Sequence, residues 1–226
     1  INLSTRPEKS IGSEAVWDLA TKGLTEALER KGWNYKIDDG GGAFYGPKID
    51  LKIEDAIGRM WQCSTIQLDF NLPERFGLDY VAADGSKQKP IMIHRAIFGS
   101  LERFFGIMTE NYAGDFPFWL APEQIRLLPV TDDVQPYAEQ VLNQLKTAGI
   151  RATIDQSGDR LGKIIRTGEQ MKIPVLAVIG AKEAEQNAVS LRSRRDGDLG
   201  VTSVDALLKA AQRANAERQP GLGLNL

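Results

Sequence analysis

Apolar residues recur three or four positions apart in two stretches of the first half of the chain, and this spacing predicts amphipathic helices. The first helix is expected between Ser13, a residue suited to the N-cap, and Gly32, a residue suited to ending a helix. Its apolar stripe consists of Val16, Trp17, Ala20, Leu24 and Leu28. The second helix is expected from about Gly99 to Asn111, with a stripe of Leu101, Phe104, Phe105 and Met108.

Between these helices the period of the pattern changes from helical spacing to strict alternation. Ile49, Leu51 and Ile53 alternate with Asp50, Lys52 and Glu54, which is typical of a half-buried strand. Two more strands are expected, over Met60–Phe70 and Ile91–His94, with a turn through Gly58 before the first of them. Strands that follow one another through tight turns predict an antiparallel sheet.

In the second half of the chain, strands alternate with helices. Strands are expected over residues 125–130, 150–154, 173–179 and 189–194, and helices over about 134–145, 161–172 and 203–218. This alternation predicts a small α/β sandwich with a largely parallel sheet. The tail, Pro220–Leu224, is expected to be loose.

An aromatic cluster bracketed by two prolines, Phe116–Pro122, separates the two patterns. We therefore expect two domains, 1–121 and 122–226. The first carries 14 basic against 17 acidic residues and the second 14 against 13, so the two parts differ little in charge.

The composition excludes several classes of protein. The chain is 42% hydrophobic and 26% charged, which argues against a disordered chain, and its net charge of -2 argues against a bulk polycation that holds nucleic acid by charge alone. A single cysteine, Cys63, excludes an internal disulfide and fits a reducing compartment. The longest apolar run, Ile173–Ala181, is far shorter than the ~20 residues of a membrane span. Because no signal peptide and no initiator Met are present, we expect a cytoplasmic piece of a longer protein, with no membrane association.

Small and polar residues share one face of the strand Met60–Phe70, namely Cys63, Thr65, Gln67 and Asp69. Hydroxyl and amide groups on a sheet face can recognise a small polar ligand, since each donor or acceptor left unpaired is costly. A solvated outer face accounts for the pattern equally well.

The next strand ends at His94, and a Gly–Ser pair then opens the helix that carries Arg103 in its first turn. Helix N-termini bind anions, and a guanidinium adds a planar fork suited to phosphate. Pairing of Arg103 with Glu102 on a helix surface is the alternative interpretation.

The second half contains a local excess of basic residues. Residues 155–195 include eight basic and five acidic side chains, and Arg160, Lys163 and Arg166 rise along one expected helix. Such a surface suits single-stranded RNA, although a solvated face has the same composition.

Longer motifs then narrow these alternatives. The segments Ser4–Lys9, Gly42–Ile49, Trp61–Phe70 and His94–Arg103 resemble, in the same order, motifs of the threonyl-tRNA synthetase family. Arg192–Arg194 together with Gly197–Gly200 resembles the anticodon-binding domain of that family. The resemblance covers nearly the whole chain.

The resemblance implies an α/β fold: an α+β class II synthetase core with an antiparallel sheet, followed by an α/β anticodon-binding domain. It also implies ATP-dependent activation of threonine and its transfer to tRNA(Thr), in a full-length protein that is a homodimer. The implied partners are tRNA(Thr), ATP and threonine, and the implied cofactors are Mg-ATP and a zinc ion.

The same resemblance implies roles for individual residues. Arg103 and Lys48 match catalytic positions. The positions matching ATP contacts are Gln62, Ser100 and Arg103, and those around threonine and the adenylate are Tyr45, Thr65 and Gln67. His94 matches one of three zinc ligands, whereas a lone histidine without this match indicates a packed residue. The anticodon-reading positions are Arg166, Glu183 and Arg192.

Other parts of the family pattern are missing from the chain. Its motifs 1 and 2, its editing domain and the other two zinc ligands do not occur in the sequence, so we expect the chain to be inactive alone. A non-catalytic tRNA-binding fragment or paralogue is the alternative. A prolyl- or histidyl-specific relative has the same domain plan, but Trp61–Cys63 and His94 disfavour it.

Overall fold

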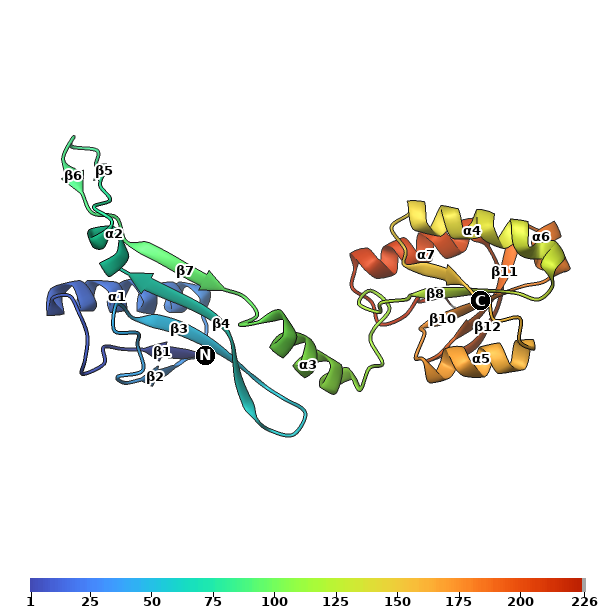
Figure 1. Cartoon of the computed structure of the whole chain (residues 1–226), viewed down its shortest axis with the longest axis horizontal. Helices are drawn as coiled ribbons and strands as arrows, with labels where there is room; N and C mark the ends of the chain where they lie inside the picture. The colour runs from blue at the N-terminus through green and yellow to red at the C-terminus, as the bar shows by residue number, and fades with distance from the viewer. Residues whose placement is uncertain (225–226) are drawn as a thin grey trace. The chain divides into compact units, whose positions relative to one another are not determined.

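The computed structural model describes residues 1–224, and the chain divides into two compact units (Figure 1). Unit 1 comprises residues 1–111, and unit 2 begins at Tyr112. Among residues 1–224, no helix combines the length and the apolar composition that crossing a membrane requires.

Unit 1 is built on a five-stranded sheet in the order β2-β1-β3-β4-β7. These strands are β1 (Asn2–Ser4), β2 (Lys36–Asp38), β3 (Lys48–Glu54), β4 (Met60–Asp69) and β7 (Met92–Ala96). Every pairing is antiparallel except that of β1 with β2. The predicted antiparallel sheet is therefore confirmed, with one parallel pair at its edge.

Helix α1 (Glu14–Lys31) covers one face of this sheet. It begins and ends where the sequence predicts, because the Ser13 hydroxyl accepts a hydrogen bond from the Val16 N–H and Gly32 forms the left-handed C-cap. Leu24 and Leu28 of the helix pack against Leu3 and Ile49 of the sheet.

A β-bulge interrupts the pairing of β3 with β4. Lys52 pairs with Gln62 and Leu51 pairs with Ser64, so Cys63 is the extra residue on β4. Alternation alone would place Gln62 and Thr65 on opposite faces of the sheet, and the extra residue brings both onto the same face.

The rest of unit 1 consists of α2 (Asn71–Arg75), the hairpin of β5 (Tyr80–Val81) and β6 (Lys87–Gln88), and α3 (Leu101–Tyr112), which ends at the boundary between the units. The predicted apolar stripe of α3 is only partly its buried side, since Phe104 and Met108 are half-buried. Ile107 is the buried residue of this helix, whereas Leu101 and Phe105 are exposed.

Unit 2 contains a second five-stranded sheet, in the order β12-β11-β10-β8-β9. Its strands are β8 (Ile125–Pro129), β9 (Ala152–Ile154), β10 (Val175–Ile179), β11 (Ala188–Ser193) and β12 (Gly197–Ser203). Strands β9, β8 and β10 are parallel, while β11 and β12 are antiparallel. The prediction of a largely parallel sheet is thus correct for three strands and wrong for two.

Helices cover both faces of this sheet (Figure 1). On one face lie α4 (Gln135–Thr147), preceded by a 3-10 turn at Asp132–Val134, and α7 (Val204–Ala216), which contribute to the main core cluster. On the other face, α5 (Leu161–Gln170) packs Ile164 against Leu128 and Leu176. The short α6 (Ala181–Glu185) follows β10.

The tail is fixed, contrary to the prediction. Leu222 is only 2% exposed and belongs to the main core cluster of unit 2. The Phe118 N–H donates to the Pro220 carbonyl (3.0 Å), and Arg213 donates to the Gly223 carbonyl (3.2 Å). The buried side chain of Leu222 anchors this segment. The segment is too short for its apolar residues to show a helix or strand period, so no pattern in the sequence indicated it.

Candidate functional site

Lys48, Thr65, Gln67 and His94, among the predicted site residues of unit 1, lie in two rows across the sheet, on the face opposite α1. In one row Ser4, Lys48, Gln67 and His94 are successive cross-strand partners. In the neighbouring row Asp50 pairs with Thr65. The intervening apolar positions, such as Ile49, point toward α1, so alternation along the strands separates a polar face from the core.

A buried carboxylate ties three of these residues together. Asp50 is 1% exposed, and its Oδ1 accepts hydrogen bonds from Gln62 Nε2 and Thr65 Oγ1, both at 2.8 Å. Its Oδ2 pairs with Lys48 Nζ at 2.5 Å. Asp50 thereby fixes the side chains of Lys48, Gln62 and Thr65 relative to one another.

A second contact fixes Tyr45, which lies in the loop before β3. The Tyr45 hydroxyl donates to Gln67 Oε1 at 2.8 Å. The loop can come this close because residue 46 is glycine: a Cβ there would lie 1.9 Å from the Leu68 carbonyl oxygen. Gly46 therefore allows the Tyr45 ring to lie over the polar face.

His94 is held by another buried carboxylate. Its Nε2 lies 2.8 Å from Oδ2 of Asp69, which is 1% exposed, and its ring meets the Tyr45 ring edge to face at 6.1 Å between centroids. Burial raises the pKa of Asp69, but hydrogen bonds from His94 and from the N–H groups of Leu72 and Asn71 outweigh that effect and hold the pKa below its usual value.

Arg103 lies at the Gln62 end of this face. Its Nη1 donates to the Gln62 carbonyl at 3.3 Å, and its guanidinium is 5.7 Å from the centre of the Trp61 ring. Ser100 caps α3, since its hydroxyl accepts from the Arg103 N–H. Gly99, with a φ of +75° and a Cβ position only 3.1 Å from the Cys63 carbonyl, lets the start of α3 approach β4.

The side chains of His, Cys, Asp and Glu in residues 1–224 form no group of three or more that could hold a metal ion. His94 can therefore supply one ligand and cannot form a site with the rest of the described chain. Its contact with a buried carboxylate is the arrangement by which proteins orient a metal-binding imidazole, so the residue fits a ligand role.

In unit 2, the predicted anticodon-reading residues do not form a cluster of direct contacts. Arg192 pairs with Leu176 near the start of β10 and donates to Glu169 of α5 at 3.0 Å. Glu183 follows the other end of β10, where its carboxylate accepts from the Gly180 N–H at 2.9 Å. Arg166 is exposed on α5.

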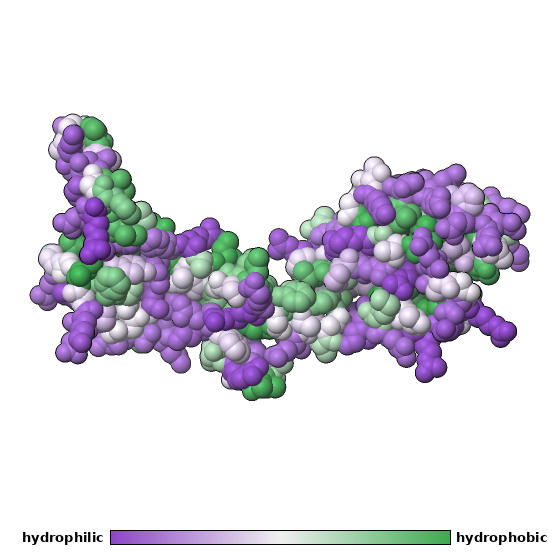
Figure 2. Space-filling model, in the orientation of Figure 1, coloured by the Kyte–Doolittle hydropathy of each residue, from purple (hydrophilic) through white to green (hydrophobic). Residues whose placement is uncertain are grey.

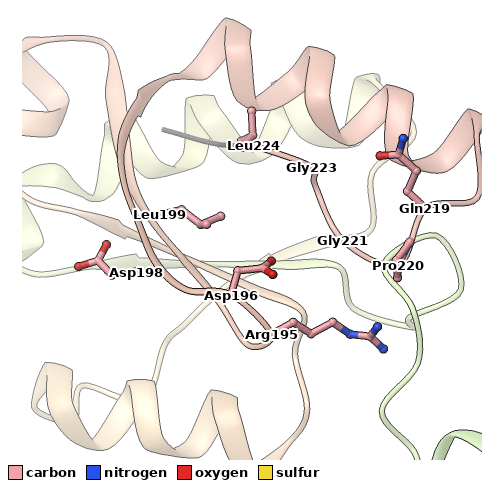
Figure 3. Close-up of a pocket in the computed structure, with 9 residues that line it drawn as sticks. All are labelled: Arg195, Asp196, Asp198, Leu199, Gln219, Pro220, Gly221, Gly223 and Leu224. Carbon is pink, nitrogen blue, oxygen red and sulfur yellow. The ribbon is translucent and has the colours of Figure 1, made fainter.

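Unit 2 has several hollows, two of which bear on the question of a ligand site. A polar cavity of about 360 Å³ lies outside the carboxyl ends of β8 and β9, where open α/β sheets commonly bind ligands; Thr131, Asp155 and Gly158 help to line it. The larger one, about 730 Å³, lies between the β11–β12 turn and the tail (Figure 3). Asp196 in its wall already accepts from the Ser193 hydroxyl, and none of the three predicted anticodon residues lines it, so the larger hollow is not the predicted site.

Sequence reasoning missed the site role of Asp50, and it identified Asp69 only as one polar side chain on the face of Met60–Phe70 and not as the partner of His94. Their positions in alternating strands are compatible with a solvated face, and only the structure shows that both carboxylates are buried acceptors. The available signal was the spacing of these aspartates from the candidates: Asp50 lies two residues from Lys48, and Asp69 lies two residues from Gln67.

Comparison with known proteins identifies both halves of the chain. Residues 5–112 match the family model "tRNA synthetase class II core domain (G, H, P, S and T)", and residues 124–214 match "Anticodon binding domain". A threonine–tRNA ligase from Synechococcus sp. (strain CC9902) is 98% identical over the whole chain, which spans 37% of the length of that relative. A chloroplastic/mitochondrial threonine–tRNA ligase of Arabidopsis thaliana is 58% identical over 92% of the chain and 32% of its own length.

A solved structure agrees with these relatives. The crystal structure of the RNA binding domain of threonyl-tRNA synthetase from Cryptosporidium parvum Iowa II superposes with a TM-score of 0.85 and 36% identity, over 98% of this chain and 55% of that one. The resemblance inferred from the motifs is thus confirmed, and the chain belongs to the class II aminoacyl-tRNA synthetases, in the family of the threonine–tRNA ligases.

Proposed function

We propose that the chain acts within a threonine–tRNA ligase, which activates threonine with ATP and transfers it to tRNA(Thr). The observation that carries this proposal is the polar sheet face, on which Asp50 joins Lys48, Gln62 and Thr65 in one hydrogen-bonded group beside Arg103. The threonine side chain and the adenylate would contact Tyr45, Thr65 and Gln67, and ATP would contact Gln62, Ser100 and Arg103.

The chemistry follows from the charges of the two substrates. A threonine carboxylate must approach the α-phosphate of ATP, so two anions are brought together. Lys48 and Arg103 are the catalytic residues we propose, because their positive charges reduce this repulsion and stabilise the charge of the transition state. Magnesium bound to the phosphates supplies further positive charge. Such catalysis depends on positioning and electrostatics and needs no nucleophile from the protein.

His94 would supply one of the ligands of a zinc ion, and the others would come from outside this chain. A zinc ion held in part by His94 would select threonine through its amino and hydroxyl groups, and valine would be disfavoured because it lacks the hydroxyl. The contact of His94 with Asp69 supports this role, since it orients the imidazole ring.

Residues 122–226 would bind the anticodon of tRNA(Thr). Arg166, Glu183 and Arg192 are the residues we propose to read the bases, and their distribution over α5, α6 and β11 suits a splayed single strand. We further propose that the ligase works in the cytoplasm as a homodimer. The buried, unpaired Cys63 is compatible with a reducing compartment, and the dimer rests on the family resemblance.

Threonine-dependent ATP–pyrophosphate exchange tests the proposal. A protein that has the length of the relatives and includes this chain should catalyse the exchange, and the 226-residue chain alone should not. Absence of exchange in the longer protein, combined with retained tRNA binding, would establish the alternative of a non-catalytic tRNA-binding protein. Exchange by the isolated chain would overturn the division of the site between this chain and other segments.

A further inference from the structure

The buried pair of Asp69 and His94 has a hydrogen-bond arrangement that fixes more than the position of the ring. Oδ1 of Asp69 accepts two backbone hydrogen bonds, from the N–H groups of Asn71 (2.8 Å) and Leu72 (3.0 Å) at the start of α2. Oδ2 is left for His94 Nε2, at 2.8 Å. The two oxygens of one carboxylate therefore have separate partners.

An ionised carboxylate only accepts hydrogen bonds, so the imidazole nitrogen beside it must carry the proton. In the neutral ring, Nε2 is then the N–H and Nδ1 holds the free lone pair. The Asp69 side chain is 2% exposed and cannot turn away without breaking its two backbone contacts, whereas the His94 side chain is 37% exposed. The ring is therefore held at one nitrogen and open at the other.

We propose that Asp69 is a positioning residue that sets the tautomer of His94 and so makes Nδ1 the nitrogen available to a ligand. This inference rests on the proposed function only where the ligand is the zinc ion. The tautomer itself is a property of residues within this chain.

The substitution Asp69→Asn tests the tautomer directly. The two backbone N–H groups fix the amide orientation, because they require an oxygen at the Oδ1 position. The amide NH2 group then faces His94 and donates to Nε2. The neutral ring must accept there, which moves its proton to Nδ1 and inverts the tautomer.

The measurement is simple because His94 is the only histidine of the chain. Nitrogen-15 spectra of the 226-residue chain, labelled at histidine and recorded at a pH where the ring is neutral, distinguish a protonated from a bare ring nitrogen. Both tautomers contain one of each, so the nitrogens are identified by their couplings to the carbon-bound ring protons: Nε2 couples to Hε1 and Hδ2, whereas Nδ1 couples strongly only to Hε1. The parent chain should have its proton on Nε2, and Asp69→Asn should have it on Nδ1. A proton that stays on Nε2 in a folded Asp69→Asn chain would overturn the proposal.

Asp55→Asn is the matched control. Asp55 is also a buried aspartate of unit 1 with two backbone N–H groups on Oδ1, from Ile57 and Arg59, while Oδ2 accepts from side chains that do not include His94. It should leave the His94 spectrum unchanged. If Asp69→Asn does not fold, Asp69→Glu supplies a second variant, which keeps an accepting carboxylate and should retain the proton on Nε2; inversion in this variant would contradict the proposal.

The consequence for metal binding is tested separately, in a protein that has the length of the relatives. Asp69→Asn should weaken zinc binding by about 10- to 100-fold, the usual effect of losing such a carboxylate partner, when free zinc is titrated into the metal-free protein. Unchanged zinc affinity despite an inverted tautomer would overturn the assignment of Nδ1 as the ligand atom. A parent protein that binds no zinc would contradict the zinc part of the proposed function and leave the tautomer result standing.

Discussion

The two units of the chain differ in how much of their sheets they bury. Among residues 1–224, unit 2 covers both sheet faces with helices and has three exposed large apolar side chains, whereas unit 1 covers one face and has eighteen, although the units are of similar length. In Figure 2, part of this apolar surface is visible on the projecting β5–β6 segment, which includes Tyr80 and Val81.

The uncovered face of unit 1 is also where the candidate chemistry lies. A helix packed there would bury Lys48, Thr65 and Gln67 and exclude a ligand. The sheet instead satisfies its polar side chains among themselves, through Asp50 and Asp69. Unit 2 can thus be stable through its own core, while unit 1 keeps one face of its sheet open, and exposed apolar surface of this kind marks contact surfaces.

The largest expected effect concerns the open face of unit 1. In a protein that has the length of the relatives, Arg103→Ala should reduce threonine-dependent ATP–pyrophosphate exchange by about 10²- to 10³-fold or more, because a preorganised positive charge near the phosphates is lost. Arg30→Ala, at the exposed end of α1, is the matched control and should retain the parent rate. An exchange rate of the Arg103→Ala protein within a few-fold of the parent rate would show that Arg103 is only a surface charge.

The second prediction compares the cores. Leu145→Ala, a fully buried position of α4, should lower the free energy of unfolding by about 2–5 kcal/mol, since it leaves a cavity in unit 2. Phe105→Ala removes a larger side chain, but that side chain is exposed on α3. The substitution should therefore change the free energy of unfolding by less than about 0.5 kcal/mol. Denaturant unfolding of the 226-residue chain gives both values. Equal losses of stability in the two variants would mean that Phe105 on α3 is covered in solution.

The third prediction concerns the surface of unit 2. Glu183→Ala and Arg192→Ala should each weaken binding of the cognate anticodon by roughly 1–3 kcal/mol, with little effect on a tRNA of swapped anticodon. Lys163→Ala, whose side chain is exposed beside Asp159, should weaken binding to both tRNAs alike and flatten the salt dependence.

Glu185→Ala is the control for Glu183, because both residues lie on α6 and Glu185 is exposed. Binding of both tRNAs is measured at two salt concentrations. Equal losses on cognate and swapped anticodons would reduce Glu183 and Arg192 to general surface charges.

The smallest expected effect is the acid sensitivity of unit 1. Burial raises the pKa of Asp55, but hydrogen bonds from Trp61 and Arg59 more than offset it and hold the pKa below its ordinary value. The stability from this depressed pKa is fully present above the unfolded pKa, about 3.9, and is lost as pH falls through the folded pKa. Unfolding followed by tryptophan fluorescence should therefore show that the free energy of unfolding falls below about pH 4. The fall should be smaller in the Asp55→Asn chain than in the parent.

Asp79→Asn removes an aspartate whose pairing with Lys89 is exposed, so its acid sensitivity should equal that of the parent. A parent chain with the same free energy of unfolding at pH 3 and pH 7 would show that the buried aspartates of unit 1 do not contribute in this way.

Sequence patterns predicted the elements that have strong periodicity or a cap. Ser13 and Gly32 delimit α1 as expected, and Met60–Asp69 forms the predicted long strand. Strand β12 was missed because Gly197 and Gly200 at its start weaken the signal of a strand. The strand was therefore missed where few residues show the alternation of apolar and polar positions.

The candidate site was predictable in its ligand-facing residues and not in its supports. Thr65 and Gln67 could be identified from the polar positions of one strand and from the family resemblance. The roles of Asp50 and Asp69 depend on which oxygen meets which donor across three strands, and no spacing along the chain contains that information. Whether a polar position is buried is decided by tertiary structure.

The bulge at Cys63 acts as a change of phase within β4. Odd-numbered residues face the polar side of the sheet after the bulge, and even-numbered residues face it before the bulge. A strand in which Cys63 was paired like its neighbours would therefore turn Met60–Gln62 over while Thr65–Asp69 kept their sides. Gln62 would exchange sides with Trp61, and its contact with Asp50 would be lost. Deletion of Cys63, by contrast, would remove the bulge and leave Gln62 on the side of Thr65. The side chains that this face presents therefore depend on one residue staying outside the ladder, and not on the order of the residues alone.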